Sequence, residues 1–298
     1  MIGLSTFWLE RGWSSLSSVE YADLWRKYGG SVATNPEVIE RLAGLAEVPV
    51  RYLGWQKEEE IIAGLPCWGR YLALSKEGLK KHRKKRLFDL GNAEIILPAA
   101  PDSGAILRHR AEYLGEPNVQ RFVGLKPQKD SLMMAREPEA LSKKFRYNQR
   151  RELRLLEDSG GTLRPVQDHS HSELAEIYSD LFQRRWQFAV PGADHLSQVF
   201  ELMHPFMTGQ VVYLDDVPIA IQVLYRVESP EWISVEYING GVDPASRNFS
   251  PGSVLSYVNV LAAWEDARSR GKTLRYSFGR ADREYKERWC RKQPVYQV

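Results

Sequence analysis

From residue 211 to residue 278 the sequence alternates short apolar strands with one long helix. Asp215-Asp216-Val217-Pro218 is typical of a hairpin turn with proline at the start of the second strand. Ser250-Pro251-Gly252 opens the helix with proline in its first turn, and Gly271 ends it. Strands and helices in this order predict a mixed α/β fold. We expect the strands at 211–214, 219–225, 232–239 and 274–278.

The rest of the chain supplies elements for a second unit. A chain of 298 residues is too long for one ordinary domain and suits two. The hydrophobic periodicity typical of helices and strands is lost between Pro127 and Pro138. We therefore place a domain boundary there and expect one domain at 1–135 and another at 136–298. The remaining helices are expected at 19–28, 36–45, 141–159, 170–182 and 196–207, and the remaining strands at 50–55, 60–65, 70–74, 94–97 and 294–298.

Composition argues against several classes of protein. Cys67 and Cys290 form no CxxC or Cys/His cluster, so we expect no disulfide scaffold, zinc finger, iron–sulfur cluster or other metal site. No run of 18 apolar residues occurs, and the first fifteen residues lack the pattern of a secretion signal. The sequence therefore predicts a folded cytoplasmic protein.

Two basic segments are candidates for binding phosphate. The run from Lys76 to Arg86 has seven Lys or Arg in eleven positions, although the net charge of the chain is only +3. Such a cluster favours tRNA or an anionic membrane surface on the inner side of the cell, or it is simply a solvated face. No helix-turn-helix or zinc pattern is present, so we expect no specific DNA partner. The second segment is a predicted helix with cations at Lys143, Lys144, Arg146, Arg150, Arg151 and Arg154.

Three strings carry a resemblance to a known family. The basic helix, Ser250-Pro251-Gly252-Ser253-Val254-Leu255, and the closing segment from Tyr276 to Trp289 with its Gly-Arg turn and Tyr-Lys pair resemble those of FemAB-like and cellulose-biosynthesis-type acyltransferases. Those proteins contain two GCN5-related N-acetyltransferase (GNAT) domains in tandem. Within them the chain is most similar to the macrophage-inducible virulence proteins associated with resistance to antimicrobial peptides. The resemblance implies two tandem GNAT-like domains, each a twisted mixed sheet flanked by helices, of which the first is degenerate.

The start of the long helix is the expected donor site. Gly252 allows close approach of a ligand, and we expect the first-turn N–H groups of Ser253 and Val254 to be unpaired within the helix. With the helix dipole they suit a pyrophosphate such as that of acyl-CoA. Arg247 and Asn248 lie just upstream and could bind the same anion. A plain helix start with proline at its first position is the alternative.

Two residues are candidates for acid–base chemistry. The resemblance implies that Tyr285 protonates the departing thiolate, and that Arg280 and Lys286 belong to the donor site. Glu236, a charge within a predicted central strand, is a candidate general base for an amine. Packing of the Tyr285 ring and a surface position for Glu236 are the alternatives. If both roles hold, we expect Tyr285, Glu236 and Gly252 to converge on one pocket.

The resemblance thus implies an acyltransferase that moves an acyl or aminoacyl group from acyl-CoA or aminoacyl-tRNA to an amine or hydroxyl. The acceptor would be a small molecule or a peptide. The alternatives are a non-catalytic binding or regulatory protein on the same fold, or a transcription regulator.

Overall fold

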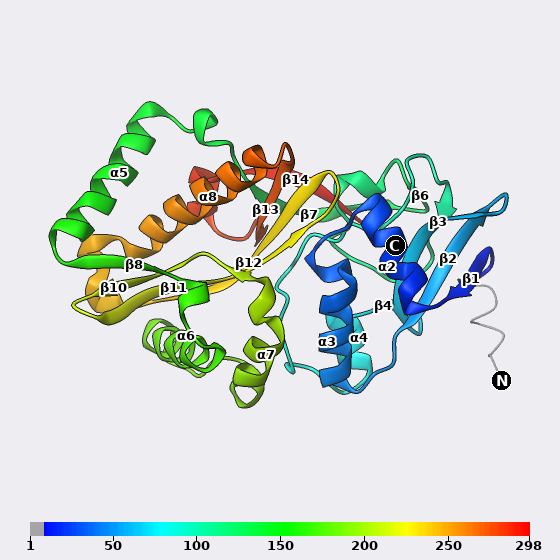
Figure 1. Ribbon diagram of the computed structural model, residues 1–298, viewed down its shortest axis with the longest axis horizontal. Helices are drawn as coiled ribbons and strands as arrows, with labels where there is room; N and C mark the ends of the chain where they lie inside the picture. The colour runs from blue at the N-terminus through cyan, green and yellow to red at the C-terminus, as the bar shows by residue number, and fades with distance from the viewer. Residues whose placement is uncertain (1–8) are drawn as a thin grey trace.

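The two larger of the three sheets in residues 9–298 lie side by side along the long axis of the protein (Figure 1). The structure is a computed structural model that describes residues 9–298. The first eight residues, part of the segment that lacks a secretion-signal pattern, lie outside the described range. No helix in residues 9–298 is long and apolar enough to cross a membrane.

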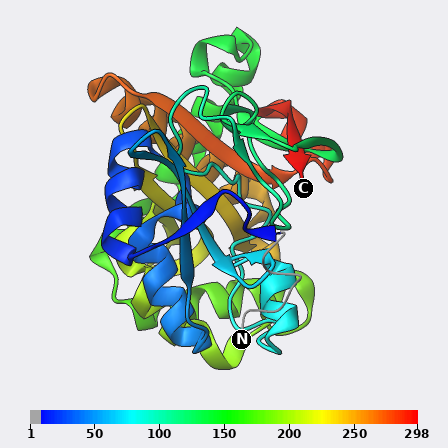
Figure 2. The same ribbon diagram turned by 90° about the vertical axis from the view of Figure 1, so that its right-hand side faces the viewer.

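The N-terminal half is a four-stranded antiparallel sheet packed against two helices (Figure 2). Ser17 forms a capping box with Glu20, and Asn35 accepts hydrogen bonds from the first-turn N–H groups of the second helix. These caps fix the starts of both helices near the expected positions. The elements are β1 (Trp13–Leu16), α2 (Ser18–Tyr28), η1 (Val32–Thr34), α3 (Pro36–Ala46), β2 (Arg51–Lys57), β3 (Glu60–Trp68), β4 (Tyr71–Leu72) and α4 (Lys76–Lys81).

Between α4 and residue 125 the chain is largely irregular. The predicted strand at 94–97 is wrong, because only Ile95 forms a bridge, with Leu114. Side chains replace a strand partner here: Ser31 Oγ accepts from the N–H of Ile96 and Asn118 Oδ1 from that of Leu97. The short elements of this segment are β5 (Ala105–Ile106), η2 (Glu116–Asn118) and β6 (Phe122–Val123).

The C-terminal half is built on an eight-stranded sheet in the order β14-β7-β13-β12-β11-β10-β8, with β9 beside β11. Helices α6 and α7 cover one face, and α8 with α5 covers the other (Figure 1). The strands are β7 (Lys126–Ala135), β8 (Gly161–Pro165), β9 (Met207–Thr208), β10 (Gln210–Leu214), β11 (Val217–Glu228), β12 (Trp232–Val242), β13 (Thr273–Arg280) and β14 (Cys290–Gln297). The helices are η3 (Pro138–Ala140), α5 (Lys143–Asp158), η4 (Val166–Asp168), α6 (His171–Trp186), η5 (Ala193–His195), α7 (Leu196–Met203), η6 (His204–Phe206), η7 (Pro244–Phe249), α8 (Pro251–Ser269) and η8 (Glu284–Arg288).

Strand β7 occupies the segment where the sequence pattern lapses. Its first half is polar and largely exposed, whereas its last four residues, 132–135, are buried between β13 and β14. The strand precedes the expected boundary after residue 135 yet pairs only with strands of the C-terminal sheet. The division into 1–135 and 136–298 stays a prediction.

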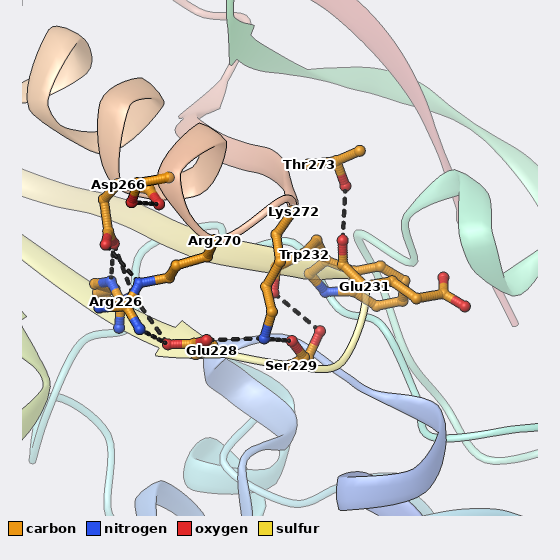
Figure 3. A network of polar contacts seen from close by, with 10 residues as sticks. Arg226, Glu228, Ser229, Glu231, Trp232, Asp266, Arg270, Lys272 and Thr273 are labelled. Atoms are coloured by element: carbon orange, nitrogen blue, oxygen red, sulfur yellow. Dashed lines mark hydrogen bonds and ion pairs between the residues drawn. The ribbon is translucent and has the colours of Figure 1, made fainter.

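An ion-pair network fixes the far end of α8 to the sheet (Figure 3). Arg226 of β11 binds Asp266 of α8 at 2.7 Å and Glu228 at 3.2 Å, and Lys272 binds Glu228 at 2.8 Å. Beside it, the indole N–H of Trp232 donates to the carbonyl of Gly30 in the N-terminal half at 2.8 Å. The network thus lies where the two halves meet.

Candidate active site

The sheet opens between β12 and β13, its only parallel neighbours among the described strands. Their pairing stops at Glu236 and Ser277, although both strands continue. Pairing with β11 shifts here from Tyr237 to Asn239, so that Ile238 forms a bulge. A bulge bends a strand, and the two strands therefore separate at their C-terminal ends.

A pocket of about 330 Å³ lies between this opening and the start of α8, and we call it the α8 pocket. Gly252 and Ser253 line it, as does Arg247. A Cβ at Gly252 would meet only Val242 Cγ2, at 3.3 Å, so the glycine leaves the wall open. The other lining residues are Arg185, Ile221, Gln222, Tyr237, Val242, Pro244, Leu255, Ser256, Tyr285 and Trp289.

Two backbone N–H groups in the first turn of α8 are hydrogen-bonded, contrary to expectation. Ser250 has φ 47°, and its carbonyl accepts from the N–H of Ser253 at 2.8 Å and of Val254 at 3.1 Å. The expectation that these two N–H groups are unpaired is therefore wrong. Pro251 has no N–H, which leaves the amide of Gly252, the helix dipole and Arg247 to attract an anion.

Two of the expected donor-site residues near the start of α8 lie outside the α8 pocket. Asn248 is exposed and does not line it. Val254 is fully buried in an apolar cluster that includes Leu156 and Leu255, because the helix turns this position toward the sheet. The side chain of Val254 therefore belongs to the core, and its N–H is already bonded to the Ser250 carbonyl.

A second pocket, of about 440 Å³, adjoins the first where β12 and β13 separate, and we call it the β12–β13 pocket. Its walls come from both strands, from α6, from the turn after β13 and from the N-terminal half. Three residues line both pockets: Arg185, Tyr237 and Tyr285. The two cavities thus meet at two phenols and one guanidinium.

Burial sets the protonation of these phenols. Partial burial raises the pKa of Tyr285, which is still 42% exposed, and Arg185 lowers it in part. Burial also raises the pKa of Tyr237, against which hydrogen bonds from Arg185 and Gln222 act. Both hydroxyls therefore keep their protons at neutral pH and can donate them.

Arg280 and Lys286 line the β12–β13 pocket and not the α8 pocket where the donor was expected. The Lys286 ammonium is buried and donates to the Arg280 carbonyl at 2.8 Å and to Asp282 at 2.9 Å. Arg280 binds Asp130 at 3.3 Å. Lys286 therefore closes the turn that follows β13.

Glu236 lies at the junction of the two halves and lines neither pocket. It is 1% exposed and accepts from the N–H of Glu94 at 2.9 Å. Burial, followed by the charge of Glu94, raises the pKa of Glu236 well above its usual range. The structure thus brings Tyr285 and Gly252 to one pocket but places Glu236 outside it, because its face of β12 packs against the N-terminal half.

Sequence reasoning missed Arg185, Tyr237 and Glu94. Tyr237 adjoins Glu236 within an apolar strand, so its phenol was a visible signal. Arg185 ends a helix 52 residues earlier, and only the fold brings it to the pockets. The charge of Glu94 at the start of an apolar segment could have indicated a buried ion pair.

Comparison with known proteins supplies the family and the fold. The Mig-14 family matches residues 35–298. FemX is similar in structure, with a TM-score of 0.57, 12% identity and 96% of each chain covered. L-PGS from Bacillus licheniformis (TM-score 0.47, 10% identity, 95% of this chain and 92% of that one) and a tandem GNAT protein from the clavulanic acid biosynthesis pathway (TM-score 0.46, 10% identity, 96% and 97%) also match. No curated protein matches the sequence.

The likeness to FemX over both chains supports the expected mixed α/β fold class, and the two tandem GNAT-like units stay what the sequence resemblance implies. At 12% identity it shows the fold alone.

Proposed function

The chain belongs to the Mig-14 family, and from that premise we propose that it is a GNAT-type acyltransferase. The supporting observation is that two pockets meet at Arg185, Tyr237 and Tyr285. A donor in the α8 pocket and an acceptor in the β12–β13 pocket would come into contact at these residues. We place the activity in envelope modification that protects against antimicrobial peptides, in line with the sequence resemblance.

In this proposal the acceptor amine or hydroxyl attacks the carbonyl carbon of the donor. The bond to the leaving sulfur, or to the ribose oxygen of an aminoacyl-tRNA, breaks as the new C–N or C–O bond forms. Tyr285 gives its proton to the leaving group, and the proton lost by the acceptor returns to the phenolate through water. Arg185 would stabilise the phenolate during the exchange.

For acyl-CoA as donor, the dipole of α8 and the guanidinium of Arg247 would attract the pyrophosphate. The pocket volume of about 330 Å³ suits the acyl end and the pantetheine arm of the donor rather than the whole molecule.

An aminoacyl-tRNA donor is favoured by a separate observation on α5. This helix packs against α8 and η7, at the side of the α8 pocket. Its six cations form no ion pair within residues 9–298, and Tyr147 among them is 61% exposed. Cations that form no ion pair and lie beside a stacking ring are suited to a nucleic-acid backbone. These cations are Lys143, Lys144, Arg146, Arg150, Arg151 and Arg154.

The test is thermal unfolding with acetyl-CoA, a longer acyl-CoA and an aminoacyl-tRNA. A ligand that binds only the folded state at about 100 times its Kd stabilises it by about 2.7 kcal/mol, which raises the midpoint. Arg247→Gln should reduce the shift with acyl-CoA, whereas Arg291→Gln, on an exposed strand position, should not. No shift with any donor would favour the non-catalytic binding or regulatory alternative.

A further inference from the structure

The β12–β13 pocket has more cationic than anionic side chains. Five of its lining residues are basic and two are acidic. Three of the five cations already contact a carboxylate, at distances of 2.9, 3.7 and 3.3 Å. These pairs are Lys286 with Asp282, Lys76 with Asp89 and Arg280 with Asp130.

The other two cations, Arg185 and Arg283, form no ion pair within the described chain. Arg185 donates to the Gly240 carbonyl at 3.2 Å and lies over the ring of Trp186, 4.8 Å from its centroid. Neither contact neutralises its charge. Against the effect of burial, Lys286 and, more weakly, Arg283 lower the pKa of Asp282, but that carboxylate is already bound by Lys286. Two guanidinium groups that line one pocket and form no ion pair leave a site for an external anion.

Both guanidinium groups lie close to the reacting phenol. Each lowers the pKa of Tyr285, against the effect of burial. Tyr285 also lines the pocket that holds them. An anion bound by Arg185 and Arg283 would therefore place the rest of its molecule beside Tyr285.

We infer that the acceptor of the transfer carries a phosphate group, which Arg185 and Arg283 bind while its nucleophile faces Tyr285. The role of the bound molecule as acceptor rests on the proposed acyl transfer. The anion site itself does not. Phosphate is favoured because its oxygens accept parallel hydrogen bonds from a guanidinium fork. The phosphate belongs either to a soluble phosphoester or to a phospholipid headgroup.

The experiment measures binding of inorganic phosphate and of glycerol 3-phosphate by calorimetry, and of phosphatidylglycerol vesicles by co-sedimentation. Arg283→Gln removes a cation that lines only the β12–β13 pocket, whereas Arg247→Gln removes one that lines only the α8 pocket. Arg291→Gln is the matched control, since Arg291 is exposed and lines neither.

We expect Arg283→Gln to weaken glycerol 3-phosphate binding about tenfold or more, because it removes one charge-assisted bidentate interaction. Arg247→Gln and Arg291→Gln should leave it unchanged. Binding of vesicles but not of glycerol 3-phosphate, with the same dependence on Arg283, would identify a lipid headgroup as the source.

Two results would overturn the inference. One is equal binding of these probes by Arg283→Gln and the unaltered protein, and the other is no binding of any of them. The thermal-shift test with donors separates this inference from the proposed function. If phosphate binding depends on Arg283 but no donor raises the unfolding midpoint, the anion site stands and the acyltransferase proposal is wrong.

Discussion

The carboxyl of Glu236 accepts a hydrogen bond from the backbone N–H of Glu94 at 2.9 Å, across the junction of the two halves. The side chain of Glu94 in turn accepts from Arg275 Nε at 2.8 Å and from its Nη2 at 2.5 Å. Ser277 also hydrogen-bonds Glu236. Two buried carboxyls and one guanidinium that is 17% exposed therefore join β12 and β13 to the N-terminal half.

Glu236→Gln should flatten the dependence of stability on pH. The folded state holds a proton on Glu236 more tightly than the unfolded state, because burial and Glu94 raise its pKa. The contribution of Glu236 to the free energy of unfolding should then be largest below the ordinary pKa of about 4.3 and be lost as pH rises through the folded value. Glutamine keeps the hydrogen bonds without titrating. Urea unfolding between pH 5 and pH 8 measures the slope, with exposed Glu59→Gln as control.

An unaltered slope in Glu236→Gln would mean that Glu236 is ionised in both states. The same variant tests the candidate base. Turnover equal to that of the unaltered protein would exclude Glu236 from the reaction, in keeping with its position outside both pockets.

Arg275→Met should destabilise the protein strongly. It would leave the Glu94 carboxylate, whose side chain is 2% exposed, buried without a partner. Removing one member of a buried pair costs about 3–5 kcal/mol, whereas replacing both members costs much less. The double variant Glu94→Gln/Arg275→Met should therefore be more stable than Arg275→Met in denaturant unfolding. A double variant no more stable than the single one would show that the pair itself is not the source of the cost.

Tyr285→Phe should lower turnover by about 10²-fold and leave donor binding intact, as expected for loss of a general acid. Tyr237→Phe is the informative comparison, since both phenols line both pockets. Tyr71→Phe changes a half-buried phenol of β4 that lines neither pocket and should have no effect. A larger loss in Tyr237→Phe than in Tyr285→Phe would transfer the role of acid to Tyr237.

Gly252→Val should block the α8 pocket. The backbone conformation of Gly252 is one that other residues adopt, and a Cβ there would meet only Val242. The two methyl groups of valine would therefore extend into the cavity. We expect acyl-CoA affinity to fall about tenfold or more, with a stability change below about 1 kcal/mol. Gly44→Val, where a Cβ meets open space in α3, is the control. Undiminished affinity in Gly252→Val would place the donor elsewhere.

The sequence predicted the elements whose ends depend on local signals. The capping box at Ser170 and Glu173 and the turn at Asp215-Asp216 lie where expected, because caps and turns involve neighbours in the chain. Strand β7 was missed because its first half is polar and does not alternate between apolar and polar residues, although it pairs within the sheet. Its assignment depends on β13 and β14, about 150 residues away.

The site was only partly predictable for the same reason. Gly252 and Tyr285 were identified from sequence motifs that resemble those of a family. The bulge at Ile238, in contrast, could not be predicted from the residues around it. That bulge separates β12 from β13 and so brings Arg185 and Tyr237 to the pockets. The pairing of the Ser253 and Val254 N–H groups was missed because it depends on the left-handed backbone of Ser250.

The basic run from Lys76 to Arg86 provides the last prediction, which concerns anionic surfaces. Lys84 binds Glu47 at 2.9 Å and Lys76 binds Asp89 at 3.7 Å, so these two are partly neutralised. Lys80, Lys81 and Lys85 are exposed and form no ion pair within residues 9–298.

Changing Lys80, Lys81 and Lys85 to glutamine together should weaken co-sedimentation with anionic vesicles or tRNA. It should also reduce the salt dependence of binding by about one unit of slope for each phosphate that is no longer neutralised. Changing the exposed Lys57, Lys126 and Lys129 alters the net charge equally and should have little effect. Because Lys76 lines the β12–β13 pocket, an anionic surface bound here would lie beside the expected acceptor. Equal binding by the two triple variants would instead mean that the run is a solvated face that responds only to net charge.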